Sequence, residues 1–278
     1  MAMIKIELPT ALPPQIIAWQ QEAQVITQQL LQAQSLAERH EIIDRHQCHW
    51  RKPELVNWLS DLSFEKCWFT ETKFGGDYQE VEHFRPKKGT KEIDGSACAN
   101  HDGYYWLAFD LSNYRLCKRR PNAKKGTFFP ICDDRFRATS PQLPWTDETP
   151  YFLDPFKDTD VLLLSFNDNG EPVPQEDIGQ IDEARVKFTI EKYFLDERVL
   201  NTRRAQTWST TRVLYTEYLN AIKEANNNGS VAKRTEAEQK LIQIKKLCSR
   251  NAEFSSVARE SLMKLPDRMA WKIASKVA

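Results

Sequence analysis

The chain has 278 residues, of which 28% are charged, and its formal net charge is +0. This balance excludes a uniformly basic nucleic-acid binder but allows a local basic patch. Aromatic residues make up 11% of the chain and only nine residues are glycine, which excludes a disordered chain. No apolar run reaches the roughly 18 residues of a membrane helix, and the first residues lack the apolar region of a secretory signal. We therefore expect a cytoplasmic protein.

The chain begins with a helical pattern. In residues 14–60 apolar side chains recur at spacings of three and four among glutamines. Residues 52–62 read as a second, short helix with a proline near its start. These patterns predict an N-terminal helical region at residues 1–60.

The residue composition changes over residues 61–160, where most of the glycines lie. Residues 66–86 suggest two short strands around a turn at Gly75 and Gly76. Residues 103–116 alternate less cleanly and are expected to form a helix that leads into a loop at Ser112 and Asn113.

From about residue 180 the pattern is helical again, with a loop signal at residues 226–230. We therefore expect a C-terminal helical region at residues 161–278 and an α+β fold overall. Trp208, Tyr215 and Tyr218 fall on one helical segment. We interpret them as part of a helix core, with a partner-binding surface as the alternative.

Four residues of the middle region stand in an order that suggests chemistry. Glu82 and His83 are adjacent, Asn113 lies thirty residues after His83, and Asn122 follows nine residues later. A neutral imidazole, with an unperturbed pKa of roughly 6.5, can take a proton from water near neutral pH. Each of these residues alone is weak evidence, because a histidine beside an acid is most often a solvated surface pair.

The ordered set resembles the HNH, or ββα-metal, endonuclease motif. Further stretches occur in an order that is similar to one HNH group, which includes the nuclease subunit of Septu-type anti-phage defence systems and the HNH effector of some retrons. These stretches are KCWFTE, VEHFRPK, GYYWLAFDLSNYRLC, NAKKGTFFPI, YFLDPFKD and KFTIEKYFLDERVLNTRR. The resemblance covers residues 64–204, about half of the chain.

The resemblance implies a ββα-metal core between two helical regions and a metal-dependent cleavage of phosphodiester bonds. His83 would be the general base, and Asn113 would orient it through a backbone contact. Glu82 and Asn122 would hold Mg²⁺ (or Mn²⁺), a cation that prefers oxygen ligands and keeps several waters. The resemblance further implies a defence function together with an ATPase partner. The alternative is a catalytically silent HNH-like module that binds nucleic acid or a partner protein.

The chain departs from the group at the two CxxC pairs that bind a structural zinc in many HNH proteins. Thr70 stands where a cysteine would follow Cys67, and Pro121 stands where a cysteine would precede Asn122. Threonine and proline cannot replace thiolates in a tetrahedral site, so we expect no structural zinc. Buried aromatic residues would then fill the volume of the metal knuckle. The alternative is a zinc held by substitute ligands nearby, namely Cys98, His101 and Cys132.

Two stretches rich in Lys and Arg adjoin the proposed site, at residues 85–91 and 118–125. Their charge suits contacts to the phosphates of DNA or RNA, although a solvated loop paired with nearby acids is the plain alternative. We expect Arg85 to bind a substrate phosphate, since a guanidinium can contact two oxygens at once. The other expected substrate-binding residues are Lys87, Lys118 and Lys125.

Overall fold

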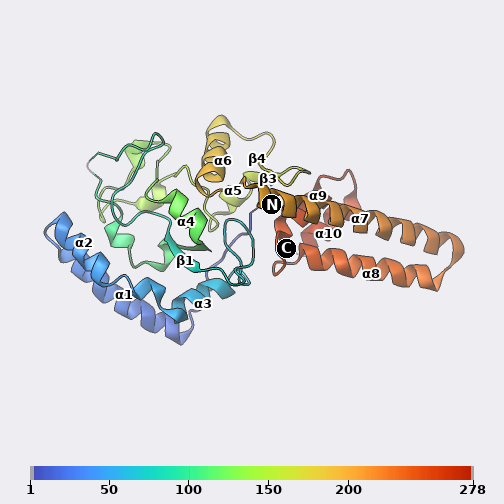
Figure 1. The fold of residues 1–278 in the computed structure, drawn as a ribbon, viewed down its shortest axis with the longest axis horizontal. Helices are drawn as coiled ribbons and strands as arrows, with labels where there is room; N and C mark the ends of the chain where they lie inside the picture. The colour runs from blue at the N-terminus through green and yellow to red at the C-terminus, as the bar shows by residue number, and fades with distance from the viewer. Residues whose placement is uncertain (1–2, 100, 277–278) are drawn as a thin grey trace.

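The computed structural model describes residues 3–99 and 101–276. It shows an α+β protein with a large body, from which a long helical hairpin extends (Figure 1). The described helices include none that combines the length and the hydropathy needed to cross a membrane.

Three helices form the N-terminal part of the body: α1 (Pro14–Gln32), α2 (Leu36–Arg45) and α3 (Pro53–Asp61). Prolines occupy the first positions of α1 and α3, where a missing N–H costs no helical hydrogen bond. The side chain of Ser35 caps α2 by accepting from the Glu38 N–H. In α1 the buried residues recur at helical spacing, which confirms the prediction of helices in this region. They are Ile16, Trp19, Ala23, Ile26 and Leu30.

A two-stranded antiparallel ribbon and a short helix lie at the centre of the body (Figure 1). Strand β1 (Gln79–His83) pairs with β2 (Tyr114–Lys118), with His83 opposite Tyr114. Helix α4 (Arg119–Lys125) follows β2 directly and packs on both strands. The prediction of a hairpin about Gly75 and Gly76 was wrong, because β1 finds its partner beyond residue 110 and residues 66 and 73 form only an isolated bridge.

The prediction of a helix that leads from residue 103 into a loop at Ser112 and Asn113 was also wrong. This segment contains two single turns of 3-10 helix, at Tyr105–Leu107 and Leu111–Asn113, and then becomes strand β2. The last residues lack a clean alternation because β2 is buried on both faces, with Tyr114, Arg115, Leu116 and Cys117 all covered.

A second small sheet joins β3 (Leu164–Phe166) to β4 (Pro172–Pro174), after the single-turn helix α5 (Asp158–Val161). Helix α6 (Gln180–Lys192) packs beside β4. Its buried Phe188 joins the main hydrophobic core, which also includes residues of α1, α3, β1 and β2. One core thus continues from the N-terminal helices to the middle of the chain.

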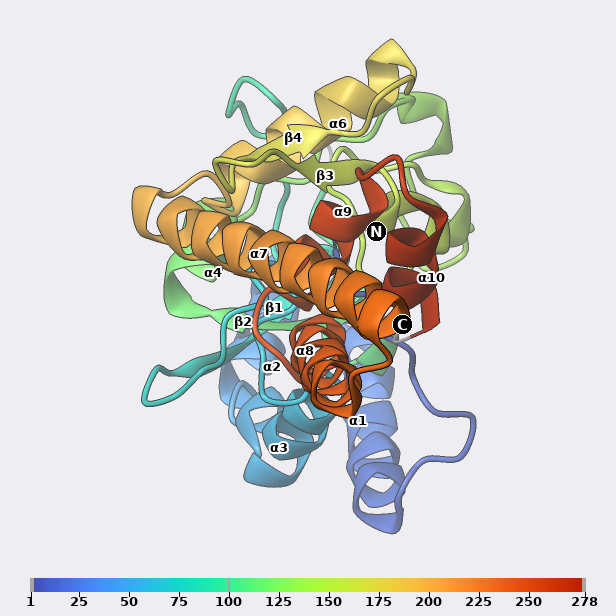
Figure 2. The same cartoon turned by 90° about the vertical axis from the view of Figure 1, so that its right-hand side faces the viewer.

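The C-terminal helices are α7 (Arg198–Asn228), α8 (Val231–Cys248), α9 (Ser255–Met263) and α10 (Arg268–Lys276). The α7–α8 pair forms the extended hairpin, and Figure 2 looks along it toward the body. The predicted loop at residues 226–230 is shorter than expected, since α7 runs to Asn228 and Gly229 supplies the left-handed turn. Trp208 and Tyr215 are buried, and Tyr218 packs against a second, smaller hydrophobic cluster that α7, α8, α9 and α10 form together, as expected for a helix core.

Candidate active site

Glu82 and Lys125 form a buried ion pair between β1 and α4. The Lys125 Nζ lies 2.5 Å from the Glu82 Oε1 and also donates to the backbone oxygen of His83 at 3.0 Å. The Lys125 side chain is 0% exposed, so it cannot contact a substrate phosphate. Burial raises the pKa of the Glu82 carboxyl, and the Lys125 ammonium opposes this rise. The prediction that Lys125 binds substrate is therefore corrected: its charge is used within the fold.

His83 stands at the end of β1 on the opposite face of the ribbon from Glu82, because neighbouring side chains of a strand alternate. Its ring lies edge-on to Trp50 and Tyr114, with centroid distances of 4.8 and 5.1 Å. The His83 Nε2 lies 2.9 Å from the carbonyl oxygen of Ala108. A carbonyl only accepts hydrogen bonds, so this contact assigns the proton of the neutral ring to Nε2 and leaves a lone pair on Nδ1.

The Nδ1 of His83, which carries the lone pair, is 3.4 Å from the Nζ of Lys87. Burial lowers the pKa of His83 well below its usual value, and the nearby Lys87 charge lowers it further. The imidazole is therefore neutral near pH 7, the form that a general base requires.

Asn113 holds the chain segment that follows His83. Its Oδ1 accepts from the Arg85 N–H at 2.8 Å, and its Nδ2 donates to the carbonyl oxygens of Arg85 and Leu107 at 3.0 and 3.1 Å. The Asn113 carbonyl oxygen accepts from the Phe84 N–H. These bonds hold the two residues after His83 against the start of β2. None of them reaches His83 itself, so the role of Asn113 in orienting His83 stays a prediction.

Asn122 contacts Glu80 rather than Glu82. Its Nδ2 donates to the Glu80 Oε2 at 2.5 Å. Glu80 and Glu82 alternate with Val81 and His83 along β1, so both acids face α4. Asn122 and Lys125 are one helical turn apart and meet one acid each.

A cavity of about 680 Å³ opens beside this end of the ribbon. Its walls include Glu80, Lys87, Asn122, Trp50 and Arg51. The side chain of Glu82 is buried and is not part of its wall. Sequence reasoning missed Glu80, although its position two residues before Glu82 on a strand already placed the two acids on one face.

The expected pair of metal ligands does not fit a divalent cation in this arrangement. The Glu82 carboxylate already has a buried cation beside it, and a metal ion shared with Asn122 would have to displace Lys125 from the core. Glu80 and Asn122 do fit, since both line the cavity and one carboxylate with one amide oxygen suffices for a hydrated Mg²⁺. The Asn122 amide would have to turn its oxygen toward the ion.

The prediction that Arg85 binds a substrate phosphate is corrected as well. Its side chain is 5% exposed, and its Nε donates to the Glu148 Oε2 at 2.7 Å. Its second guanidinium bond goes to the Trp145 carbonyl oxygen at 3.0 Å. Glu148 also accepts from the Tyr104 hydroxyl at 2.6 Å, so Arg85 is part of a buried polar network.

The other two basic residues remain accessible. Lys87 lines the cavity, and Lys118 is partly exposed and bonds to Asp77 at 2.7 Å. Burial lowers the pKa of Lys87 to about 8, an effect that the Glu82 charge partly offsets. Of the four predicted substrate contacts, Lys87 and Lys118 thus keep a position from which they can meet a ligand.

The two remaining knuckle cysteines, Cys67 and Cys117, are both fully buried. The backbone of Trp68, next to Cys67, donates to the carbonyl oxygen of Leu116, next to Cys117, at 3.0 Å. Burial raises the pKa of the Cys117 thiol well above its usual value, and the neighbouring Cys67 raises it further. The Thr70 hydroxyl is 2.8 Å from that of Thr72.

Among the proposed substitute ligands, His101 has both ring nitrogens engaged. Its Nε2 bonds to the Ala138 carbonyl oxygen and its Nδ1 accepts from the Gly103 N–H. Within residues 3–99 and 101–276, no group of three or more His, Cys, Asp and Glu residues is arranged to hold a metal ion.

We expect the purified protein to contain no stoichiometric zinc. The reason is that Thr70 and Pro121 offer no thiolate at two of the four positions. Elemental analysis by mass spectrometry checks this expectation. About one zinc per chain that disappears in Cys67→Ser or Cys117→Ser would contradict it, whereas zinc that persists in both variants would point to a site elsewhere.

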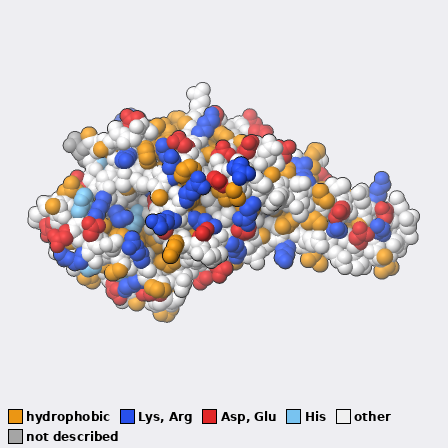
Figure 3. Space-filling view, viewed as in Figure 1, with side chains coloured by type: hydrophobic (Ala, Val, Ile, Leu, Met, Phe, Trp, Pro, Cys, Tyr) orange, Lys and Arg blue, Asp and Glu red, His pale blue; other side chains and the backbone are white. Residues whose placement is uncertain are grey.

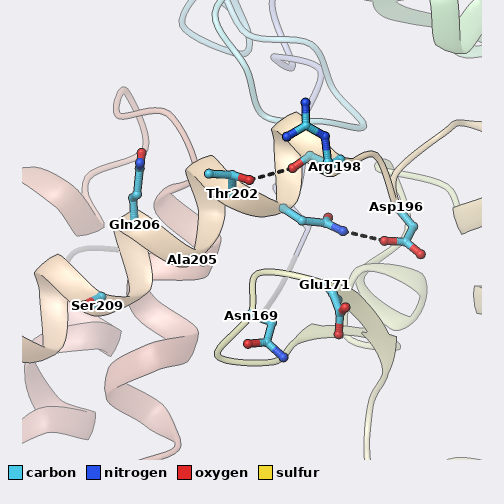
Figure 4. A pocket seen from close by; sticks show the side chains of 9 residues that line it. Asn169, Glu171, Asp196, Arg198, Thr202, Ala205, Gln206 and Ser209 are labelled. Carbon is cyan, nitrogen blue, oxygen red and sulfur yellow. Dashed lines mark hydrogen bonds between the residues drawn. The ribbon is translucent and has the colours of Figure 1, made fainter.

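A separate cavity of about 720 Å³ lies where the start of α7 meets the turn between β3 and β4 (Figure 4). Its polar groups bond to one another: Asn201 donates to Asp196 at 2.5 Å, and the Thr202 hydroxyl donates to the Arg198 carbonyl oxygen at 2.9 Å. His83 is not part of either wall, but Lys87 in the wall of the 680 Å³ cavity contacts its Nδ1 at 3.4 Å. We therefore place the candidate chemistry at the cavity that Glu80, Lys87 and Asn122 line.

Comparison with known proteins agrees with one part of the resemblance. This chain is similar to the Septu protein PtuB of Bacillus mycoides (strain KBAB4). The two are 31% identical over 161 residues, which is 56% of this chain and 52% of the relative. The chain thus spans about half the length of the curated relative it matches. No family model matches the chain.

Proposed function

We propose that this chain is a nuclease of the HNH type that acts in anti-phage defence. The observation that carries the proposal is the position of His83 at the end of β1, followed by β2 and α4, with its Nε2 held by a backbone carbonyl and its Nδ1 turned toward a cavity wall. The similarity to a Septu protein supports the defence role. An ATPase partner is part of the proposal and rests on the resemblance alone.

The proposed reaction is the hydrolysis of a phosphodiester bond by water. Nδ1 of His83 takes the proton of the attacking water, and the bond from Nε2–H to Ala108 stabilises the imidazolium that forms. Lys87 covers Nδ1 in the free protein, and its ammonium is placed to move onto the substrate phosphate. A divalent ion held by Glu80 and Asn122 would supply charge stabilisation at the phosphate and the leaving oxygen.

The experiment that tests the function is cleavage by the purified full chain. Supercoiled plasmid, single-stranded DNA and structured RNA are each incubated with the protein, with Mg²⁺ or Mn²⁺ and with a chelator. We expect nicked or shortened products that depend on the metal. Protein carrying His83→Ala, purified in parallel, separates this activity from a contaminating nuclease.

A silent binding module is the second candidate. It is favoured by the ion pair of Glu82 with Lys125, because the Lys125 ammonium already neutralises the carboxylate that was expected to bind the metal ion. Under this candidate the protein binds the same nucleic acids but yields no products with any metal, and His83→Ala changes nothing.

We expect nucleic-acid binding to weaken as the pH rises through about 8. The pKa of Lys87 lies near 8, so its cation is present below that pH and is lost above it. Fluorescence anisotropy of a labelled oligonucleotide across this pH range measures the effect. Lys87→Arg is the matched control, because a guanidinium stays charged and should move the loss of binding to higher pH. A loss that stays near pH 8 in Lys87→Arg would assign it to another group.

A further inference from the structure

A third cavity, of about 670 Å³, adjoins the 680 Å³ cavity that Glu80, Lys87 and Asn122 line. The two cavities share three wall residues: Asp77, Tyr78 and Arg119. Tyr78 immediately precedes β1 and is 79% exposed, which is unusual for a tyrosine at the entrance to a buried strand. Its ring therefore stands on the ridge between the two hollows, free to contact whatever lies across them.

The walls of these two cavities carry an excess of positive charge. The acidic wall residues are Asp77, Glu80 and Glu197. Against them stand twice as many basic residues, namely Arg51, Lys87, Lys118, Arg119, Arg120 and Arg203. Since the whole chain is neutral, this is a local concentration, and Figure 3 shows Lys and Arg side chains gathered in the middle of the same face, over α4.

Two of these arginines are only loosely held by protein acids. The Arg119 side chain is 76% exposed and its Nε is 3.9 Å from Glu80, while that of Arg120 is 65% exposed and 3.8 Å from Glu197. Neither contact has the length of a hydrogen-bonded pair. The Arg120 guanidinium lies over the Phe194 ring at 4.7 Å, which positions it without neutralising its charge. Both remain able to bind phosphate.

We propose that this ridge binds an unpaired stretch of nucleic acid, with one base stacked on Tyr78 and the flanking phosphates on Arg119 and Arg120. An exposed ring beside cations is the surface that single strands use, because an unpaired base offers a π-face while its backbone offers charge. Bases inside a duplex have no free face to stack. The inference rests on the proposed function and deepens it: Tyr78 selects unpaired nucleotides beside the cleavage site.

The test is binding by fluorescence anisotropy of the full chain to phosphorothioate oligonucleotides, which resist cleavage. Single-stranded DNA, single-stranded RNA and a DNA duplex of equal length are compared. We expect Tyr78→Ala to weaken binding of single strands by about 5- to 150-fold, the equivalent of one stacked base, and Tyr78→Phe to bind like the native chain. The matched control is Phe136→Ala, since Phe136 is also exposed, at 53%, and lies outside both cavities.

Several outcomes would overturn the inference. One is unchanged single-strand binding in Tyr78→Ala; another is a duplex that binds as tightly as a single strand and loses as much affinity on that substitution. A third is a Tyr78→Ala variant that binds nucleic acid normally but no longer binds a co-purified protein, which would assign the ridge to a protein partner. The DNA and RNA arms separate the two sources of unpaired bases. If the protein cleaves duplex plasmid and Tyr78→Ala changes neither binding nor cleavage, the inference fails and the proposed nuclease function stands. If single-strand binding depends on Tyr78 but no substrate is cleaved, the inference stands and the proposed nuclease function fails.

Discussion

His83→Ala is expected to slow phosphodiester cleavage by about 10²- to 10⁴-fold, the usual contribution of a general base. Nδ1 is the atom that would take the proton from water, and alanine leaves nothing in its place. Binding of the oligonucleotide should change little, since the proposed phosphate contacts come from Lys87 and the arginines of the ridge. Single-turnover cleavage and anisotropy, measured on the same preparation, separate the two effects.

The fold should survive this substitution. Removing the imidazole leaves the Ala108 carbonyl oxygen with a donor, because the Tyr114 hydroxyl also bonds to it at 2.8 Å. The loss of ring contacts with Trp50 and Tyr114 should still lower the melting temperature somewhat. His83→Gln is the matched control: it can keep a donor to Ala108 but is no base. Native-like activity in both variants would leave the motif without a catalytic role and favour the silent module.

The sequence predicted the elements whose signal is local. Helices α1 and α3 follow from their apolar spacing and N-terminal prolines, and β1 lies within residues 66–86, where two short strands were predicted. The partner of β1 was not predictable in this way, because a local turn at Gly75 and Gly76 competed with a strand more than thirty residues away. Tertiary packing of Tyr114 and Leu116 decided between them.

The candidate site shows the same division. Asn113 bonds to the backbone of Arg85, two residues beyond His83, whereas two of the cations predicted to bind substrate, Arg85 and Lys125, are buried. Arg85 finds Glu148 and Lys125 finds Glu82, at separations along the chain of 63 and 43 residues. A charge that lies near a motif in sequence looks available for substrate until the acid that neutralises it is known. Burial decides whether such a charge can bind substrate. An unpaired charge in the core is costly, so a buried cation is paired with an acid and cannot contact a substrate phosphate.

Glu82→Gln is expected to destabilise the fold by about 3–5 kcal/mol, the usual cost of leaving one partner of a buried ion pair without the other. Lys125 is 0% exposed, so its ammonium would keep a neutral amide as its nearest partner. Chemical denaturation followed by circular dichroism measures the change. The double variant Glu82→Gln with Lys125→Met removes both charges and should recover part of the lost stability, because the cost lies in the unpaired charge rather than in the missing bond.

Glu80→Gln gives the contrasting result that separates a structural acid from a metal-binding one. Glu80 lies at the cavity wall and is partly exposed, so its substitution should change the free energy of unfolding little. Cleavage should instead require more Mg²⁺, and added metal should restore part of the rate, because a carboxylate ligand has become a weaker amide. Extra metal should not rescue His83→Ala. If Glu82→Gln were as stable as the native chain and its activity returned with added Mg²⁺, Glu82 would be the metal ligand and Lys125 would have to leave its buried position when the ion binds.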